Sequence, residues 1–272
     1  MKQDNPGTAA GVAAVPSGSS ESLKVTPSCN GVAEAVSPSL GVTDGVPAFE
    51  LKFLLDPARA ERVLTWARCH LAPDPHADPA LGGAYRVHSL YLDTAGLDVY
   101  HQADSYRRRK YRLRRYGAEP WLFLERKSRW GDRVAKRRTR VDETEVGRLR
   151  AELSSASWPA DWFHQGLVAR RLGPTCRVSY DRLAFIGTTA TGRVRLTLDR
   201  DVRCAPADGW SVTEIPDGMS LLTGESILEL KFLASLPGLF KDLILEAGLN
   251  PRSASKYRMG VRAWGMDGSP GR

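Results

Sequence analysis

The stretch SILELKF, residues 226–232, alternates apolar side chains with Glu229 and Lys231. FELKF, residues 49–53, repeats the same acid and base in the same order far earlier in the chain. Because successive side chains of a β-strand point to opposite faces, each stretch places an acid and a base on one face and apolar residues on the other. The chain therefore contains one strand design twice.

Further strands of the same alternating character follow between these two. We expect strands at residues 49–55, 86–94, 110–117, 121–129, 133–141, 175–186, 192–202 and 226–232. Apolar residues at helical spacing predict helices at residues 56–71, 143–155, 160–172 and 237–249. The mostly hairpin order of the strands favours an antiparallel barrel.

One face of nearly every expected strand is polar or charged. Its positions are Glu50, Lys52, Arg112, Arg114, Glu125, Lys127, Lys136, Arg138, Arg140, Tyr180, Arg182, Arg193, Arg195, Glu229 and Lys231. In an ordinary sheet such a face meets water, and for any single strand this interpretation is the simpler one. The whole set favours another, because solvated faces usually mix both signs and these positions are mostly Arg and Lys.

The apolar face of the strands would supply the surface that the amphipathic helices need. Its residues are Leu51, Phe53, Leu113, Leu122, Leu124, Val194, Leu196, Leu198, Leu228 and Leu230. We therefore predict an α+β fold, an eight-stranded antiparallel β-barrel with helices outside and a tunnel with a charged lumen inside. Crowded like charges repel strongly at reduced dielectric, so we expect a polyanion and metal ions to neutralise the lumen.

Net charge and composition indicate the kind of partner and the ends of the folded domain. The net charge of +8 indicates a polyanionic partner, which could be nucleic acid, anionic lipid or a phosphorylated small molecule. Residues 1–47 have no aromatic residue and no sustained period, so we expect a disordered tail there, one domain at 48–265 and a short tail at 266–272. No run of about 18 apolar residues and no signal sequence is found, which favours a cytoplasmic protein.

Common binding motifs are missing from the sequence. There is no GxxxxGK[ST] and no GxGxxG, so a triphosphate would have to be held by side chains. The four cysteines have no zinc-binding spacing. The basic run YRRRKYRLRR, residues 106–115, suggests nucleic acid as an alternative partner, but it lacks the stacked aromatic residues of single-strand binders and nucleic acid is disfavoured.

Eight short motifs occur in an order that resembles a known family. They are HSLYLDT, KYRLRRYG, LERKSR, AKRR, SYDRLAF, VRLTLD, LELKF and SKYRMG. Together they resemble the VTC (vacuolar transporter chaperone) domain, the polyphosphate polymerase branch of the CYTH, or triphosphate tunnel metalloenzyme, superfamily. The resemblance covers about residues 49–264 and implies an eight-stranded tunnel whose basic residues hold a nucleoside triphosphate or a polyphosphate chain.

The resemblance also implies roles for individual residues. As catalytic, phosphate-contacting residues it suggests Arg112, Arg114, Lys127, Arg182, Arg195 and Lys256. As substrate-binding residues it suggests Lys52, Lys136, Tyr180, Lys231 and Ser255. Glu229 looks like the ligand of a divalent metal ion, Mn²⁺ or Mg²⁺.

One departure from the superfamily pattern narrows the expected activity. Its phosphatases and cyclases carry ExExK in the first strand, whereas Ala48 stands here at the first glutamate position. We therefore expect a metal-dependent polymerase that transfers the γ-phosphoryl group of ATP to inorganic polyphosphate, with a second metal ion in doubt. The alternatives are a hydrolase of the same fold and a non-catalytic polyphosphate-binding module. The family resemblance suggests a membrane-protein partner, through which the chain could associate with a membrane.

Overall fold

The computed structural model describes residues 46–152 and 157–268. Nearly all of the tail expected at 1–47, and the last four residues of the one expected at 266–272, lie outside the described residues. The domain limits therefore stay a prediction. No helix in the described ranges has the length and apolar composition needed to cross a bilayer.

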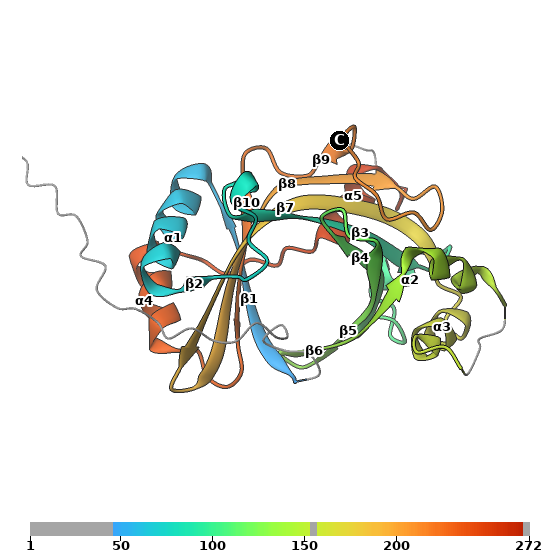
Figure 1. The fold of residues 1–272 in the computed structure, drawn as a ribbon, viewed down its shortest axis with the longest axis horizontal. Coiled ribbons are helices and arrows are strands. Elements are labelled where there is room, and N and C mark those ends of the chain that lie inside the picture. The colour runs from blue at the N-terminus through green and yellow to red at the C-terminus, as the bar shows by residue number, and fades with distance from the viewer. Residues whose placement is uncertain (1–45, 153–156, 269–272) are drawn as a thin grey trace, which may run out of the picture. The chain divides into compact units, whose positions relative to one another are not determined.

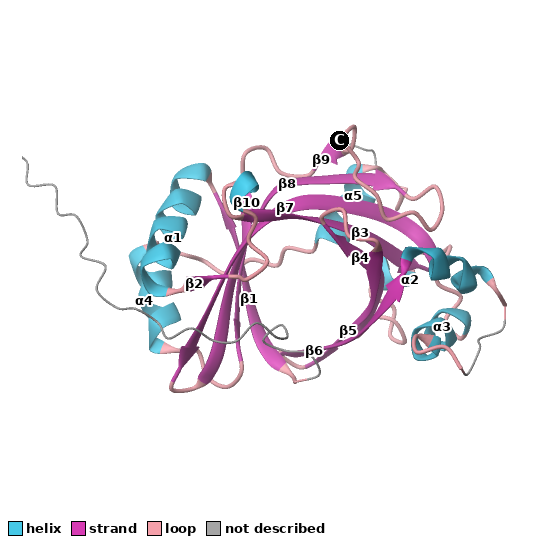
Figure 2. Ribbon diagram, in the orientation of Figure 1, coloured by secondary structure: helices cyan, strands magenta, loops and turns pink. Residues whose placement is uncertain are grey.

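Eight antiparallel strands form a closed ring. They are β1 (Ala48–Leu55), β3 (Ala84–Asp93), β4 (Arg109–Tyr116), β5 (Trp121–Trp130), β6 (Arg133–Asp142), β7 (Gly173–Thr189), β8 (Gly192–Pro206) and β10 (Ser226–Phe232). The order around the ring is β1-β10-β8-β7-β3-β4-β5-β6 and back to β1. Figures 1 and 2 show the strands surrounding a central opening. This confirms the predicted tunnel fold. Two short strands are added to the sheet: β2 (Ala72–Pro73) pairs with β7, and β9 (Met219–Ser220) pairs with β8.

Helices pack against the ring, and the last of them begins at the lumen with Lys256. They are α1 (Pro57–His70), α2 (Asp98–His101), α3 (Asp161–Val168), α4 (Gly238–Glu246) and α5 (Lys256–Ala263), with 3₁₀ segments η1 (Pro79–Leu81) and η2 (Glu143–Arg150). Figure 1 shows α1 and α4 beside each other, with α3 across the ring from them. The N-terminus of α1 has an Asp56 cap that accepts a hydrogen bond from the Arg59 amide at 2.7 Å, and Pro57 follows in the first turn.

Two helix predictions needed correction. The helix expected at 143–155 is instead the 3₁₀ segment η2, which begins at an Asp142 capping box and ends at Arg150. The helix expected at 160–172 is shorter, since α3 spans Asp161–Val168 and Arg171 has a positive φ of 52°, which a right-handed helix does not allow.

The apolar faces of the strands point outward and form two cores under the helices. One core packs Phe53, Leu198 and Leu228 of the sheet against Val63 of α1 and Phe240 of α4, all buried. Of the ten apolar residues expected on this face, nine are buried, and Leu51 is partly buried against the same core.

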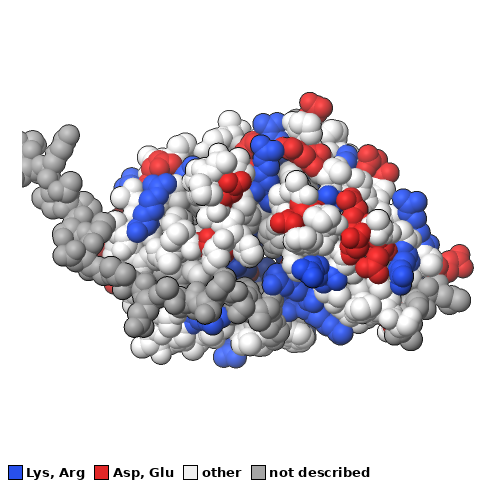
Figure 3. Space-filling view, in the orientation of Figure 1, with Lys and Arg blue, Asp and Glu red and all other residues white. Residues whose placement is uncertain are grey.

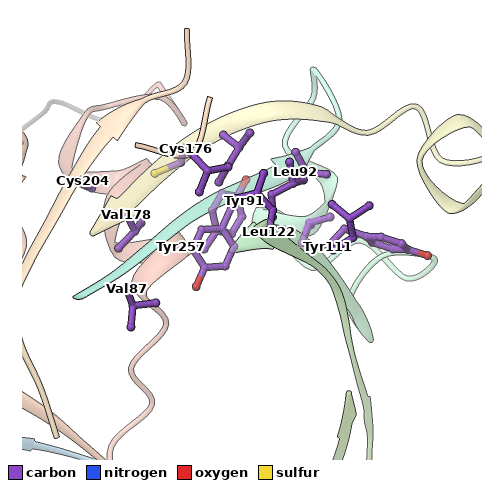
Figure 4. Packing of buried hydrophobic residues seen from close by; sticks show 14 of the residues in the cluster. Val87, Tyr91, Leu92, Tyr111, Leu122, Cys176, Val178, Cys204 and Tyr257 are labelled. Atoms are coloured by element: carbon purple, nitrogen blue, oxygen red, sulfur yellow. The ribbon is translucent and has the colours of Figure 1, made fainter. Parts of the chain in front are cut away.

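The second core lies on the other side of the ring. It packs Leu113 and Leu122 of the sheet with Phe163 of α3. Figure 4 shows another part of this core, where the rings of Tyr91 and Tyr257 lie beside each other with their centroids 5.3 Å apart. Tyr91 also lines the lumen. Most apolar side chains of the strands therefore lie on the outside of the ring, and most polar ones line the inside.

The ring is unevenly closed. β1 pairs with β10 from Phe49 to Leu55 but with β6 only at Ala48 and Phe49. Beyond that point the free edge of β1 meets the segment before α5, where the Arg252 amide donates to the Lys52 carbonyl at 2.8 Å. The segment before α5 therefore completes part of the tunnel wall.

Candidate active site

The lumen is a cavity of about 1750 Å³ lined by the polar faces of the strands. All twelve residues singled out from the sequence line it: Lys52, Arg112, Arg114, Lys127, Lys136, Tyr180, Arg182, Arg195, Glu229, Lys231, Ser255 and Lys256. Ten come from strands of the ring, whereas Ser255 and Lys256 come from the start of α5. On the face drawn in Figure 3, Lys and Arg side chains lie around the middle of the ring. The fold brings the predicted residues together, while their individual roles remain predictions.

The two ELKF strands are direct neighbours, which explains the repeated design. Glu50 lies opposite Lys231, and Lys52 lies opposite Glu229. The Lys231 Nζ is 2.7 Å from a Glu229 oxygen and 3.6 Å from a Glu50 oxygen. The Lys52 Nζ lies 3.2 Å from Glu50 and 3.3 Å from Glu229. Each lysine therefore bridges both carboxylates.

A third lysine joins this cluster from β5. The Lys127 Nζ donates to both oxygens of Glu50, at 2.8 and 3.0 Å. Burial alone would raise the pKa of Glu50, but Lys127, Lys52 and Lys231 outweigh that effect and lower it to about 2. Burial lowers the pKa of Lys127 to about 8, although Glu50 opposes the shift.

Another carboxylate, Glu125 on β5, organises the next part of the wall. It is 1% exposed. It accepts a hydrogen bond from Arg112 Nε at 2.7 Å, and Lys136 lies 3.5 Å away. Burial would raise the pKa of Glu125, but Arg112, Lys136 and Arg114 hold it well below its usual value. The sequence placed Glu125 on the charged face but gave it no role.

A further carboxylate, Asp199 on β8, was missed by the sequence analysis. It is fully buried and accepts two hydrogen bonds from Arg182, at 2.6 and 2.8 Å, and one from Lys256 at 2.5 Å. Burial would raise its pKa, and the charges of Arg182 and Lys256 lower it instead. Its position was readable, because Asp199 lies at even spacing from Arg195 on the same strand.

Tyrosines complete the wall between the cations. Arg114 donates to Tyr180 at 3.0 Å and to Ser89 at 3.1 Å. Arg112 lies 3.4 Å from the Tyr91 hydroxyl. Burial would raise the pKa of Tyr91, but Arg112, Arg114 and Lys256 lower it to about 8. Tyr91 was not among the expected site residues.

Arg195 stands apart from these clusters, toward the segment that precedes η1. Its Nη2 lies 2.6 Å from an Asp74 oxygen and 3.0 Å from the Tyr85 hydroxyl. Neither partner was expected from the sequence. Asp74 follows β2 in the irregular segment before η1, where no strand or helix period marks a lumen position.

Lys110 is a further lumen cation that sequence analysis did not single out. It donates to the Ser255 hydroxyl at 3.1 Å, and in the described part of the chain it has no ion-pair partner. The other lysines that line the lumen, at positions 52, 127, 136, 231 and 256, all pair with a carboxylate. Burial lowers the pKa of Lys110 to about 8. Among the described residues, Lys110 is thus the one lysine of the lumen without a carboxylate partner.

The lumen offers little to a metal ion bound by protein alone. Within residues 46–152 and 157–268, no three His, Cys, Asp or Glu side chains gather into a metal-binding group. Glu50 and Glu229 are neighbouring carboxylates that share the ammonium groups of Lys52 and Lys231. Two carboxylates fit a hard divalent ion that takes its remaining oxygen ligands from phosphate and water. They do not form a closed metal site.

Comparison with known families identifies the chain. The model of the VTC domain matches residues 48–265. The chain belongs to the VTC domain family. A search of curated protein sequences finds no match to this VTC domain.

Several solved structures resemble this VTC domain at low identity. A candidate adenylate cyclase from Bacillus halodurans has a TM-score of 0.49 at 10% identity, covering 77% of this chain and 94% of its own. A candidate adenylyl cyclase from Hippeastrum, described as having a dominant triphosphatase activity, has a TM-score of 0.43 at 14% identity, with 77% and 93% covered. One from Vibrio parahaemolyticus has a TM-score of 0.43 at 11% identity, with 79% and 98% covered.

Proposed function

We propose that this VTC domain is a polyphosphate polymerase that transfers the γ-phosphoryl group of ATP to the end of a growing polyphosphate chain. The observation that supports this most is the convergence of twelve predicted phosphate- or metal-binding residues on one lumen. The lumen has a strong excess of Arg and Lys, and buried cations of this kind need anions. Membership of the VTC family supports polyphosphate as that anion.

Transfer would require a bond to form between a terminal oxygen of the chain and the γ-phosphorus. The bond from the γ-phosphorus to the β–γ bridging oxygen would break, and ADP would leave. The attacking oxygen of a phosphate is already ionised near neutral pH, so no general base is needed. The charge that the protein must stabilise lies on the non-bridging phosphate oxygens.

The lumen residues would stabilise that charge by being in place beforehand. Arg112 and Arg182 are each held by two hydrogen bonds or ion pairs to buried carboxylates, Glu125 and Asp199. A cation fixed in this way costs little reorganisation when phosphate arrives. Lys110, Tyr180 and Ser255 would add donors from the other sides of the cavity.

A divalent ion fits the proposal through Glu229. We propose that Glu229, with Glu50 beside it, would hold Mn²⁺ or Mg²⁺ together with phosphate oxygens. When bound there, the ion would neutralise charge on the phosphates. Lys52 and Lys231, which now bridge the two carboxylates, would then turn toward phosphate.

The test is to incubate the purified chain with ATP and Mn²⁺ and to separate the products on a gel stained for polyphosphate. Chain growth with release of ADP is the expected result. Free phosphate without chains would identify a hydrolase of the same fold. Tight polyphosphate binding without turnover, with either metal, would identify a binding module. An Arg114→Gln variant should abolish product, whereas Arg62→Gln on the outside of α1, an exposed arginine, should not.

A further inference from the structure

Aromatic rings line the lumen at the end where a turn joins β4 to β5. Toward that turn the lumen-facing residues of both strands change from charged to aromatic. On β4 Arg114 is followed two positions later by Tyr116, and on β5 Glu125 is preceded by Phe123 and Trp121. Tyr116, Trp121 and Phe123, here called the aromatic patch, all line the cavity. The charged wall therefore gives way to ring surface at this end.

Strand pairing places the patch directly beside a proposed phosphate-binding residue. Arg114 lies opposite Phe123 across β4 and β5. The rings of Tyr116 and Phe123 meet edge to face, with their centroids 5.7 Å apart. The Arg114 guanidinium carbon lies 5.9 Å from the centroid of the Tyr116 ring. A ligand that contacts both Arg114 and the patch therefore needs an anionic part joined to a flat apolar part.

Guanidinium groups of β6 lie against two of the rings. The guanidinium carbon of Arg138 lies 4.7 Å from the centroid of the Phe123 ring, and that of Arg140 lies 5.3 Å from the Trp121 ring. Both arginines also line the cavity. Contacts of this kind hold a ring in one orientation, so less freedom is lost when a ligand stacks beside it. The patch is therefore arranged before a ligand arrives.

The patch is accessible from the cavity. Its three rings are half-buried, whereas the other tyrosines of the lumen are at most 7% exposed, namely Tyr85, Tyr91 and Tyr180. Phe49, the remaining phenylalanine of the lumen, stacks on Phe232 at 5.5 Å. Among the described residues, no ring stacks face to face on Trp121 or Phe123. Ring surface that is left against water in this way favours a ligand that covers it.

The distance from the patch to the lysine cluster suits a nucleotide. Phe123 and Lys127 are four residues apart on β5, which is about 13 Å along an extended strand. Lys127 holds Glu50 of the proposed metal site, and Arg112 reaches the wall between them. An extended nucleoside triphosphate has a comparable length from its base to its γ-phosphate. A base on the patch therefore leaves the phosphates among Arg114, Arg112 and Lys127.

We propose that the aromatic patch binds the base of the nucleoside triphosphate by stacking, chiefly on Trp121 and Phe123. This rests on the proposed function, and it adds a base-binding subsite and an orientation of the nucleotide. The base lies at the end of the tunnel formed by the turn between β4 and β5, and the γ-phosphate points toward Lys127. Stacking on an aromatic side chain strengthens binding and tolerates different bases, because every base has a π-face.

The test measures two ligands by calorimetry on the full chain. They are the β,γ-imido analogue of ATP and ribose 5-(β,γ-imido)triphosphate, which has the same phosphates and no base. We expect wild type to bind the ATP analogue about tenfold more tightly, as stacking on an aromatic ring predicts. Trp121→Leu and Phe123→Leu should each reduce this difference and leave ribose triphosphate affinity unchanged. Trp121→Phe keeps a ring and should retain most of the difference.

Trp130→Leu is the matched control, because Trp130 ends the same strand, is 53% exposed and lies on the face opposite the lumen residues of β5. It should bind both ligands like wild type. The comparison of the two ligands on wild type needs no variant, so it holds even where a substitution prevents folding.

Three results would overturn the inference. Equal affinity of wild type for the two ligands would show that the base is not bound. An undiminished difference in both leucine variants of the patch would show that the base is bound elsewhere. The same loss in Trp130→Leu as in Trp121→Leu would show an effect that does not come from the lumen. If wild type binds neither ligand, the proposed function itself fails, which is a separate outcome.

Discussion

Lys256 Nζ lies 2.5 Å from Asp199 Oδ2 inside the tunnel wall. The two residues come from β8 and from the start of α5, and the same carboxylate also holds Arg182 of β7. One buried acid thus fixes two cations that reach the lumen from different parts of the chain. This arrangement makes Asp199 a positioning residue, and it leads to the first prediction.

Replacing Asp199 with Asn should weaken triphosphate binding and lower stability together. The change leaves Arg182 and Lys256 buried without a counter-charge, and breaking such a pair costs about 3–5 kcal/mol. We expect a lower urea midpoint and a raised KM for ATP. Asp201→Asn is the matched control, because Asp201 is an exposed carboxylate paired with Arg203 at 3.1 Å. Equal behaviour of the two variants would contradict the positioning role.

The pair Arg112 and Glu125 allows binding and folding to be separated. Arg112→Gln alone should destabilise the chain, because it strips a principal partner from a carboxylate that is 1% exposed. Adding Glu125→Gln should recover only part of the lost stability, because the two amides are neutral in the wall but Lys136 and Arg114 lose the carboxylate of Glu125. Tripolyphosphate affinity should stay low in the double variant.

Thermal melting and calorimetry on both variants check this prediction. If the double variant regains wild-type affinity for tripolyphosphate, Arg112 does not contact phosphate and serves only to satisfy Glu125.

Affinity for tripolyphosphate should fall as the pH rises from 7 to 9. Burial lowers the pKa values of Lys110 and Lys127 to about 8, so both lysines lose their protons in this range while the ligand stays anionic. Lys110→Arg keeps the charge, because a guanidinium does not titrate here, and it should flatten the profile. A wild-type profile that is level across this range would contradict the prediction.

Glu229→Gln should keep the fold and most phosphate affinity while turnover falls by orders of magnitude. Gln has nearly the same shape but cannot neutralise a divalent ion, and the charge that the ion stabilises develops during transfer. Turnover at saturating ATP, titrated with Mn²⁺, measures the effect. A rate within about threefold of wild type corresponds to less than 1 kcal/mol of barrier and would remove Glu229 from the metal site.

Much of the ring could be predicted, because the alternation of polar and apolar residues is visible within each single strand. Alternation of side chains within one strand is enough to place Glu229, Lys127 and Arg182 on a common face. The same alternation also places Asp199, which we overlooked. What alternation cannot supply is register, and the partners of Glu50 depend on which residues of three strands lie opposite one another.

The helices were predicted less well than the strands, because their positions depend on tertiary packing. The segment of α5 was not predicted as a helix, and it contains Gly260. A Cβ at Gly260 would lie 2.8 Å from Cys176 Sγ and 3.3 Å from Cys204 Cβ. The glycine therefore permits α5 to approach β7 and β8 closely, and only the tertiary contact reveals this need.

The uneven closure of the ring has a consequence for how the protein is made. The main partner of β1 is β10. The first strand of the ring to be synthesised therefore cannot form its main pairing until the last strand of the ring has been synthesised. Until then β1 has only its two-residue contact with β6, and the edge that Arg252 later covers is open. Unpaired strand edges and pairings between distant segments make folding slow and expose nascent chains to aggregation. Synthesis of this domain therefore passes through a long interval in which a chaperone has a sheet edge to protect.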